Sequence, residues 1–256
     1  MTQDPMLDTI IVIPCYNEEH RLDRVAIQYF VEANPSTGLL LVNDGSTDKT
    51  QETLESIERI HPGSIEILRL AENSGKAEAV RQGFRKSFPA NPRYLGFWDA
   101  DLATPLQAVR EFRDVLDTRS NFQMVFGSRV QLLGRMIKRS ALRHYLSRIF
   151  ATLVSLKTGL PIYDSQCGAK LFKVSPELIS VFEDPFLNRW IFDVEIIMRF
   201  IGLAKISDSL KIEDLIYEHP LEKWQDVRGS KITPVAVLRS LLDLYLIPSK
   251  HRTHSS

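Results

Sequence analysis

The chain has 256 residues, of which 44% are hydrophobic and 25% are charged; these values exclude whole-chain disorder and a fibrous repeat. Lys and Arg together number 32, as do Asp and Glu, so the neutral chain lacks the basic excess of nucleic-acid-binding proteins. Its two cysteines, Cys15 and Cys167, cannot form a disulfide framework and favour a reducing, cytoplasmic compartment.

Strand-like and helix-like segments alternate through the first half of the chain. The expected strands are 9–13, 39–42, 65–70, 94–98 and 124–126, and the expected helices are 18–31, 50–60, 76–88 and 105–116. Such alternation predicts an α/β fold with a mostly parallel central sheet and helices on both faces.

The second half has a less regular pattern. It predicts helices at 138–156, 176–182, 193–201 and 233–246, with a loop at 157–170. No linker rich in Pro, Gly and Ser divides the chain, so we expect a single domain that spans residues 1–256.

No segment has the pattern of a signal peptide or a spanning helix. The N-terminus is polar and acidic, and charged residues interrupt the longest apolar stretches, 145–162 and 235–247. We therefore expect a chain that does not cross a membrane, although either stretch has the composition to lie on a membrane surface.

Polar residues follow each predicted strand of the first half. These strand ends are residues 14–18, 43–46, 72–76, 99–101 and 127–129. Asp, Asn, Gly and Ser are ordinary turn residues, which explains any one of these loops. Their recurrence at five successive strand ends favours a ligand site, because open α/β sheets bind ligands beyond the carboxyl ends of their strands.

Asp99 and Asp101 follow the apolar run 94–98 directly. In an extended segment, residues two apart lie on the same side, and two neighbouring carboxylates need a cation to neutralise them. The pattern predicts an Mg²⁺ or Mn²⁺ site that serves a diphosphate leaving group. Asp44 is a candidate for a hydrogen bond to a nucleobase or ribose, and Lys76 for contact with phosphate or base oxygens. The G-x-G-x-x-G and P-loop signatures are absent, which argues against a dehydrogenase and an ATPase.

Four motifs of the first half, in their order and spacing, resemble the inverting glycosyltransferases of family 2. They are IVIPCYNEE, LVNDGSTD, NSGKAEAVRQG and FWDADLATP. Later segments resemble the dolichyl-phosphate glucosyltransferase branch of that family. They are GSR (127–129), KRSALR (138–143), DSQCGAKLF (164–172), RWIFDVE (189–195) and GSK (229–231). The resemblance extends over about residues 8–231 and differs from the usual motifs at Ala77 and Leu102.

The resemblance implies a GT-A fold, a nucleotide-diphospho-sugar donor such as UDP-glucose, and a polyprenyl phosphate acceptor. It implies a nucleoside pocket lined by Pro14, Tyr16, Glu18 and Asp44, with Lys76 nearby. It also implies that Asp99 faces the ribose or the metal and that Asp101 ligates the metal. We expect a donor-binding lobe at 8–118, an acceptor lobe at 119–231, and a C-terminal helix and tail at 232–256. The eukaryotic relatives carry an N-terminal membrane anchor, which we do not expect in this chain.

The segment between Asp117 and Asp164 contains eight basic residues and no acidic one. Arginines recur every four residues at 135, 139 and 143, which predicts one shared helical face. An apolar stripe lies beside them: Leu142, Tyr145, Leu146, Ile149, Phe150 and Leu153. Arginines and an apolar surface suit a phosphate on an isoprenoid tail and a membrane surface. The candidates for the acceptor phosphate or the donor diphosphate are Arg129, Arg139 and Arg143, with Ser140. A core-packing helix with a solvated basic face would show the same spacing.

A phosphate acceptor is already anionic at neutral pH and needs no general base, whereas a sugar hydroxyl does. Asp193 is therefore predicted either to hold sugar hydroxyls or to orient an arginine; in a transferase that acts on hydroxyls it would be the base. An acid at a helix N-terminus is also favoured by the helix dipole alone. Gln166 is a candidate contact for the donor sugar, and Lys231 for a segment that orders over it. Besides a transferase with a phosphate acceptor and one with a hydroxyl acceptor, a third hypothesis is a non-catalytic module that binds nucleotide-sugars.

Overall fold

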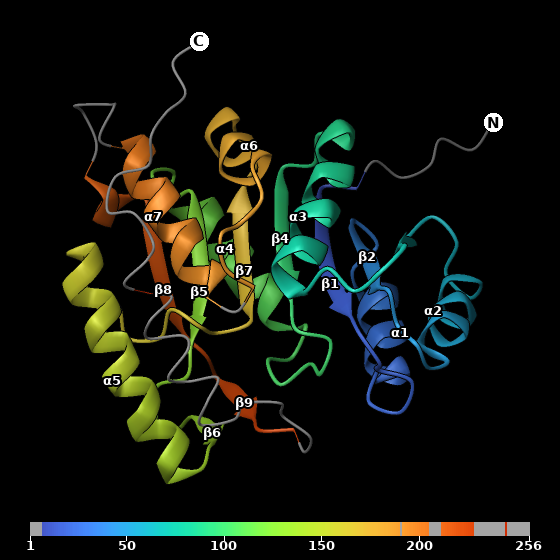
Figure 1. The fold of residues 1–256 in the computed structure, drawn as a ribbon, viewed down its shortest axis with the longest axis horizontal. Coiled ribbons are helices and arrows are strands. Elements are labelled where there is room, and N and C mark those ends of the chain that lie inside the picture. The colour runs from blue at the N-terminus through green and yellow to red at the C-terminus, as the bar shows by residue number, and fades with distance from the viewer. Residues whose placement is uncertain (1–6, 190, 205–210, 228–243, 245–256) are drawn as a thin grey trace.

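The computed structural model describes residues 7–189, 191–204, 211–227 and 244. Its centre is a seven-stranded sheet in the order β3-β2-β1-β4-β7-β5-β8 (Figure 1). In that order the strands are β3 (Ile65–Leu70), β2 (Thr37–Asp44), β1 (Thr9–Cys15), β4 (Tyr94–Trp98), β7 (Ala169–Lys173), β5 (Met124–Ser128) and β8 (Ile216–Pro220). Only β7 runs antiparallel to its neighbours, so the predicted mostly parallel sheet is confirmed.

Helices cover both faces of the sheet, as predicted. One face carries α1 (Arg24–Ala33), α2 (Thr50–Glu58) and α4 (Ala108–Thr118); the other carries α3 (Lys76–Ser87), α5 (Ala141–Thr158), α6 (Pro176–Glu183) and α7 (Phe192–Ala204). Strand β1 shows the division, because Ile10 and Val12 join one apolar cluster while Ile11 and Ile13 join the other. A separate parallel pair is formed by β6 (Met136–Lys138) and β9 (Lys223–Gln225).

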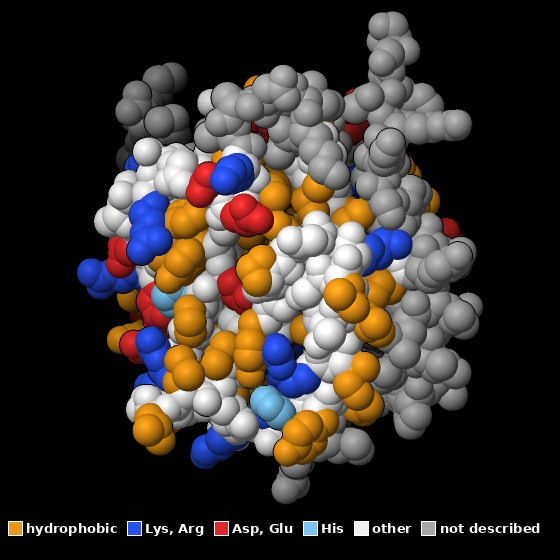
Figure 2. All heavy atoms as spheres, turned by 90° about the vertical axis from the view of Figure 1, so that its left-hand side faces the viewer, with side chains coloured by type: hydrophobic (Ala, Val, Ile, Leu, Met, Phe, Trp, Pro, Cys, Tyr) orange, Lys and Arg blue, Asp and Glu red, His pale blue; other side chains and the backbone are white. Residues whose placement is uncertain are grey.

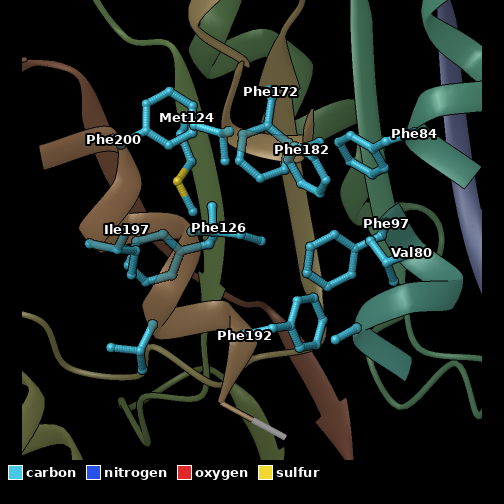
Figure 3. Packing of buried hydrophobic residues seen from close by; sticks show 14 of the residues in the cluster. Val80, Phe84, Phe97, Met124, Phe126, Phe172, Phe182, Phe192, Ile197 and Phe200 are labelled. Atoms are coloured by element: carbon cyan, nitrogen blue, oxygen red, sulfur yellow. The ribbon is translucent and has the colours of Figure 1, made fainter. Parts of the chain in front are cut away.

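Aromatic side chains fill the core beneath α3 and α6 (Figure 3). The Phe84 ring stacks on Phe182 with centroids 4.0 Å apart, and it meets Phe97 and Phe172 edge-on. Gly83 lets α3 approach the sheet closely, since a Cβ there would lie 2.4 Å from a methyl group of Val12. This packing fixes the N-terminus of α3 beside the carboxyl ends of β1 and β4.

Most helix and strand boundaries lie within a few residues of those expected. The first helix begins at Arg24 instead of residue 18, because the Asp23 side chain caps it by accepting from the Ala26 amide at 2.9 Å. The segment 76–88 ends in a 3₁₀ turn at Phe88–Ala90. Leu244 is buried in the core, and the rest of the helix expected at 233–246 lies outside the described residues, as does Lys231.

Two expectations for the second half are wrong. The segment 157–170 is not a loop throughout, because β7 begins at Ala169 and lies between β4 and β5. Helix α5 begins only at Ala141, so Arg135 and Arg139 precede it and cannot share a helical face with residue 143. The short strands β6, β8 and β9 were not predicted either. Within the part of the chain that the structure describes, no helix is long and apolar enough to cross a membrane.

Replacing Phe84 by Ala should lower the free energy of unfolding by about 3–5 kcal/mol, because the substitution opens a cavity among four aromatic rings. Urea unfolding followed by circular dichroism measures this change. Tyr29→Ala, at a side chain 64% exposed on α1, is the control and should shift the value by no more than about 0.5 kcal/mol. Equal losses in the two variants would contradict this account of the core.

Candidate functional site

The loops after β1 and β2 are joined side by side at the carboxyl edge of the sheet. The Asn17 amide donates to Ser46 Oγ at 3.1 Å, and Asn17 Oδ1 accepts from the Thr47 amide at 2.9 Å. The Glu18 amide donates to Thr50 Oγ1 at 2.8 Å. Of the residues predicted for a nucleoside pocket, Pro14 and Tyr16 lie half-buried on this edge; Glu18 is almost fully buried.

Asp44 connects this edge to the loop before α3. One carboxylate oxygen accepts from the Ser74 amide at 2.8 Å, and the other accepts from the Gly75 amide at 2.9 Å. Asp44 is only 2% exposed, and Gly75 adopts a left-handed conformation with φ +93°. The structure therefore gives Asp44 a part in fixing the loop that precedes Lys76.

Asp99 and Asp101 belong to one tight turn after β4. The Leu102 amide donates to the Asp99 carbonyl at 3.0 Å, and Leu102 has φ +48°, so the expected extended conformation is wrong. Burial and the neighbouring Asp99 carboxylate raise the pKa of Asp101. Although this segment is a turn and not an extended chain, it still brings both carboxylates together.

The donor set at this turn fits a hard divalent cation. It offers carboxylate oxygens, and two protein ligands leave coordination positions for phosphate oxygens and water, as Mg²⁺ and Mn²⁺ sites commonly require. No group of three or more His, Cys, Asp or Glu ligands occurs among the described residues. Any metal here would accordingly depend on oxygens from a bound phosphate.

Two basic side chains accompany these carboxylates. Lys76 forms an ion pair with Asp99, and Arg21 Nη2 lies 3.8 Å from Asp101 Oδ2. Burial alone would lower the pKa of Lys76, but Asp99, Asp193 and Asp101 outweigh it, so the pKa of Lys76 is raised. Lys76 therefore stays charged and lies among the carboxylates. Arg21 was missed because it lies in the segment 18–31, which was expected to be a helix, and nothing in its local sequence distinguishes it from a solvated helix residue; in the structure it is a half-buried turn residue before α1.

Asp193 pairs with a lysine that the sequence analysis missed. Lys170 on β7 is 0% exposed, and its Nζ donates to Asp193 Oδ1 at 2.5 Å and to the carbonyls of Ser165 at 3.1 Å and Cys167 at 2.8 Å. Asp193, at the start of α7, is 3% exposed. A lysine within the apolar run Ala169–Lys173 was the available signal, but its segment was taken for a loop.

The loop before β7 lies directly against the Asp99 turn. The Asp99 amide donates to the Gly168 carbonyl at 2.8 Å, and a Cβ on Gly168 would lie 1.8 Å from Asp99 Oδ2. A side chain at this position would force the Asp99 carboxylate to move. Gln166 is half-buried in the turn two residues earlier, while Cys167 is fully buried, and burial raises the pKa of its thiol to about 11.

The Arg129 side chain forms an ion pair with Asp164, in the loop before β7. Its Nε and Nη2 donate to the two carboxylate oxygens of Asp164 at 2.5 and 2.6 Å, and its guanidinium lies 5.3 Å from the centre of the Trp224 ring. Glu218 on β8 accepts from the amides of Tyr163 and Asp164 at 2.8 and 2.6 Å. Arg129 thus ties the end of β5 to the segment before β7.

Arg139 approaches the same carboxylate. Burial would raise the pKa of Asp164, but Arg129, followed by the weaker influence of Arg139, lowers it overall. Ser140 is exposed just before α5, where its carbonyl accepts from the His144 amide at 3.0 Å. Residue 143 belongs to α5, but its side chain lies outside what the structure describes.

Helix α5 exposes an apolar face. The apolar face of α5 consists of Tyr145, Leu146, Ile149, Leu153 and Leu156. The opposite side, with Phe150 and Val154, packs into the core, so the predicted stripe divides between the two sides. Figure 2 views the side of the molecule that carries α5 and shows surface hydrophobic side chains with basic ones between them.

Sequence comparison identifies relatives over most of the chain. The profile of Glycosyl transferase family 2 matches residues 10–177. A dolichyl-phosphate beta-glucosyltransferase of Trichomonas vaginalis is 31% identical over 94% of this chain and 73% of its own length. The protein with that description in Saccharomyces cerevisiae is 31% identical over 93% and 73%, and the one in Homo sapiens is 29% identical over 90% and 71%.

Comparison with solved structures shows the fold. A glucosyl-3-phosphoglycerate synthase of Mycobacterium tuberculosis, crystallised with Mn²⁺ and UDP-glucose, superposes with a TM-score of 0.63. It is 19% identical, and the match covers 96% of this chain and 83% of that one. A second crystal structure of the synthase, with Mn²⁺, UDP and glucosyl-3-phosphoglycerate, has a TM-score of 0.61 at 20% identity over 94% and 80%.

Asp164→Asn should lower the free energy of unfolding at pH 7 by about 3 kcal/mol, because it leaves the buried Arg129 guanidinium without its charge partner. The folded-state pKa of Asp164 is depressed, so its contribution is present above the unfolded pKa of about 4 and is lost as the pH falls through the folded pKa. Urea unfolding at several pH values should show the difference between wild type and variant shrinking in acid. A difference independent of pH would contradict the pairing, and Asp114→Asn on the exposed side of α4 is the control.

Proposed function

The chain belongs to glycosyl transferase family 2 and is a glycosyltransferase, and from this premise we propose that it moves glucose from UDP-glucose onto a polyprenyl phosphate. The names of the relatives support the acceptor class, because three of them are dolichyl-phosphate beta-glucosyltransferases. The crystals of a structural neighbour with Mn²⁺ and UDP-glucose support the donor and a divalent metal.

The observation that carries the acceptor half of the proposal is the apolar face of α5. Helix α5 begins two residues after Arg139, and its apolar face contributes five large exposed side chains, of which Tyr145 is 68% and Leu156 77% exposed. An isoprenoid phosphate combines an anionic head with a long apolar chain, so it requires these two kinds of surface next to each other.

In the proposed site, Asp99 and Asp101 hold the divalent ion, Mg²⁺ or Mn²⁺. When bound, the ion supplies positive charge that neutralises the departing diphosphate. Lys76 lies against Asp99 and adds a second positive charge on the donor side. Pro14, Tyr16, Glu18 and Asp44 are assigned to the nucleoside, and Gln166 and Lys231 to the donor sugar. In this assignment residues 8–118 bind the nucleotide and the metal, whereas 119–231 bind the acceptor and also contribute the contacts to the donor sugar.

The chemistry of the step follows from the charge of the acceptor. A phosphate oxygen attacks the anomeric carbon and forms the new bond; the bond from that carbon to the diphosphate breaks, and its electron pair leaves with UDP. In-line attack inverts the carbon and gives a β-linked product from an α-linked donor. The protein must align two anions and offset their repulsion, which is the task of the basic residues.

The state of Asp193 favours this acceptor over a sugar hydroxyl. A general base needs an accessible oxygen to take the proton. Asp193 is 3% exposed, and its Oδ1 accepts from the Lys170 ammonium. We therefore assign Asp193 to the donor-sugar side of the site, and the hydroxyl-directed alternative and the non-catalytic module lack a supporting observation of this kind.

The arginines divide between two tasks. The Arg129 guanidinium donates two hydrogen bonds to Asp164, so we assign Arg129 to holding the segment before β7. Arg139, which approaches that pair from the segment before α5, is assigned to the acceptor phosphate together with Ser140 and Arg143. Arg129 is therefore assigned a structural role and not a direct contact with the phosphate.

The proposal includes contact with the cytoplasmic surface of a membrane. A polyprenyl phosphate resides in a bilayer, and the apolar face of α5 would reach it if the helix lay along the interface. Leu133, exposed in the segment before β6, would add to this surface. The two free cysteines are in keeping with a reducing compartment.

Asp101→Asn should reduce UDP release from UDP-glucose in the presence of a short polyprenyl phosphate and Mn²⁺ by about 100-fold or more, since it removes a charge that the metal needs. Arg139→Ala should instead raise KM for the lipid phosphate about tenfold and leave UDP affinity unchanged, because it removes one charge-assisted contact.

Arg135→Ala is the control for the Arg139 variant, since Arg135 lies four residues away and is paired with Glu222 at 3.2 Å. Wild-type turnover with soluble saccharides but not with lipid phosphate would refute the proposed acceptor.

Tyr145→Glu should weaken binding to phosphatidylcholine vesicles that contain phosphatidylserine by about tenfold, because it places a charge in the apolar face of α5. Co-sedimentation with the vesicles measures the bound fraction. Tyr29→Glu is a matched control, since Tyr29 is 64% exposed and lies on α1, on the opposite side of the molecule (Figure 1). Equal binding by both variants would mean that α5 does not meet the membrane.

A further inference from the structure

We propose that Lys170 is a positioning residue of the transfer reaction, which holds the loop 165–168 and the N-terminus of α7 in the relative geometry that the donor sugar requires. This inference rests on the proposed function and deepens it. Lys170 does not touch the substrates in this account. It acts through Asp193 and through the loop that contains Gln166.

The bonding of Lys170 is complete and directional. An ammonium has three N–H donors, and here three acceptors receive them: Asp193 Oδ1 and the carbonyls of Ser165 and Cys167. The side chain is 0% exposed, so water cannot substitute for any of these acceptors. Lys170 therefore fixes the distance between the loop before β7 and the first turn of α7.

Both elements that Lys170 joins face the carboxylate turn. The loop reaches it through Gly168, whose carbonyl accepts from the Asp99 amide and whose Cα leaves no space for a side chain beside Asp99 Oδ2. Helix α7 reaches it through its first residue, Phe192, whose ring centre lies 5.5 Å from the Nζ of Lys76, the ion-pair partner of Asp99. A shift of Lys170 would consequently move groups on two sides of the donor site.

Aromatic rings surround the two ammonium groups. The Lys170 and Lys76 Nζ atoms lie 5.4 and 5.8 Å from the centre of the Phe97 ring, and Lys76 lies 5.5 Å from that of Phe192. Lys170 also lies 5.7 Å from the centre of Phe126, and Figure 3 shows Phe97 and Phe192 side by side with Phe126 apart from them. The rings restrict where Lys170 can place its charge.

Stability alone does not account for a lysine at this position. Replacing a buried ion pair by apolar residues of similar volume is often neutral or stabilising, because desolvation offsets the attraction. The core around Phe97 and Phe126 would accept such residues. The lysine adds what an apolar side chain cannot, which is simultaneous bonding to a carboxylate and two carbonyls.

Helix α7 offers a matched ion pair away from the donor site. Arg199 is 7% exposed, pairs with Glu195 at 2.8 Å, and donates to the carbonyls of Val181, Asp184 and Pro185. Like Lys170, it joins a carboxylate of α7 to backbone carbonyls of a preceding segment. None of its partners belongs to the carboxylate turn or to the loop 165–168.

The test compares Lys170→Met with Arg199→Met in the full chain. For each variant we would measure the melting temperature, the affinity for UDP with Mn²⁺ by calorimetry, and kcat and KM for UDP-glucose with a polyprenyl phosphate. Both variants are expected to melt earlier than wild type. Lys170→Met should lower kcat about 100-fold while UDP affinity stays within about threefold, and Arg199→Met should keep kcat within about threefold.

Lys170→Arg provides a second variant if Lys170→Met does not fold. It keeps a positive charge beside Asp193, but its planar guanidinium cannot place donors on the three oxygens as the ammonium does. It should retain UDP affinity and lose kcat about tenfold or more. Unchanged kcat in either Lys170 variant, parallel kcat losses in the Arg199 variant, or failure of both Lys170 variants to fold would overturn the positioning role. Absence of turnover in the wild type would instead overturn the proposed function.

Discussion

Alternation of opposite charges at the carboxyl edge of the sheet is the constraint on which the site depends. The charges pair as Arg21 with Asp101, Lys76 with Asp99, and Lys170 with Asp193. Two carboxylates in one partly buried turn repel each other, and burial together with the neighbouring Asp99 carboxylate raises the pKa of Asp101. Basic side chains relieve that repulsion before any ligand arrives, and a divalent ion with its diphosphate would enter a site whose acidic groups are already gathered. The strands supply the positions, but the charge balance makes this arrangement of their ends stable.

Local patterns in the sequence were sufficient for the donor half of the fold. Strands β3 and β4 lie within the limits that their apolar runs predicted, and the polar loops after β1, β2 and β4 meet at one edge as parallel strand ends must. Strand β7 escaped because its five residues include a buried lysine, and lysine in a short run normally indicates solvent exposure. Its antiparallel position between β4 and β5 depends on tertiary contacts, which the local periodicity of hydrophobic residues does not reveal.

Side-chain partners were harder to predict than positions. Arg129 was correctly placed at the end of a strand, yet its partner Asp164 is 35 residues away in the chain. The pairing of Lys170 with Asp193, and the contact of Gly168 with Asp99, likewise join segments that only the folded sheet brings together. The turn at Asp99 was taken for extended chain because the two-residue spacing of the acids fits both conformations. A motif therefore indicated which residues gather, whereas the fold decides which of them remain available to a ligand.

The availability of side chains is also what separates the possible acceptors. A hydroxyl acceptor needs a carboxylate with an oxygen open to the substrate, but Asp193 is enclosed and bonded, and Asp164 is spent on Arg129. An anionic acceptor needs positive charge, and the 46-residue interval 118–163 supplies eight basic residues and no acidic one. Helix α5 adds a surface that is apolar on its outer side although its inner side already completes the core. In the proposed function, that outer side is the surface that would contact the isoprenoid chain of the acceptor.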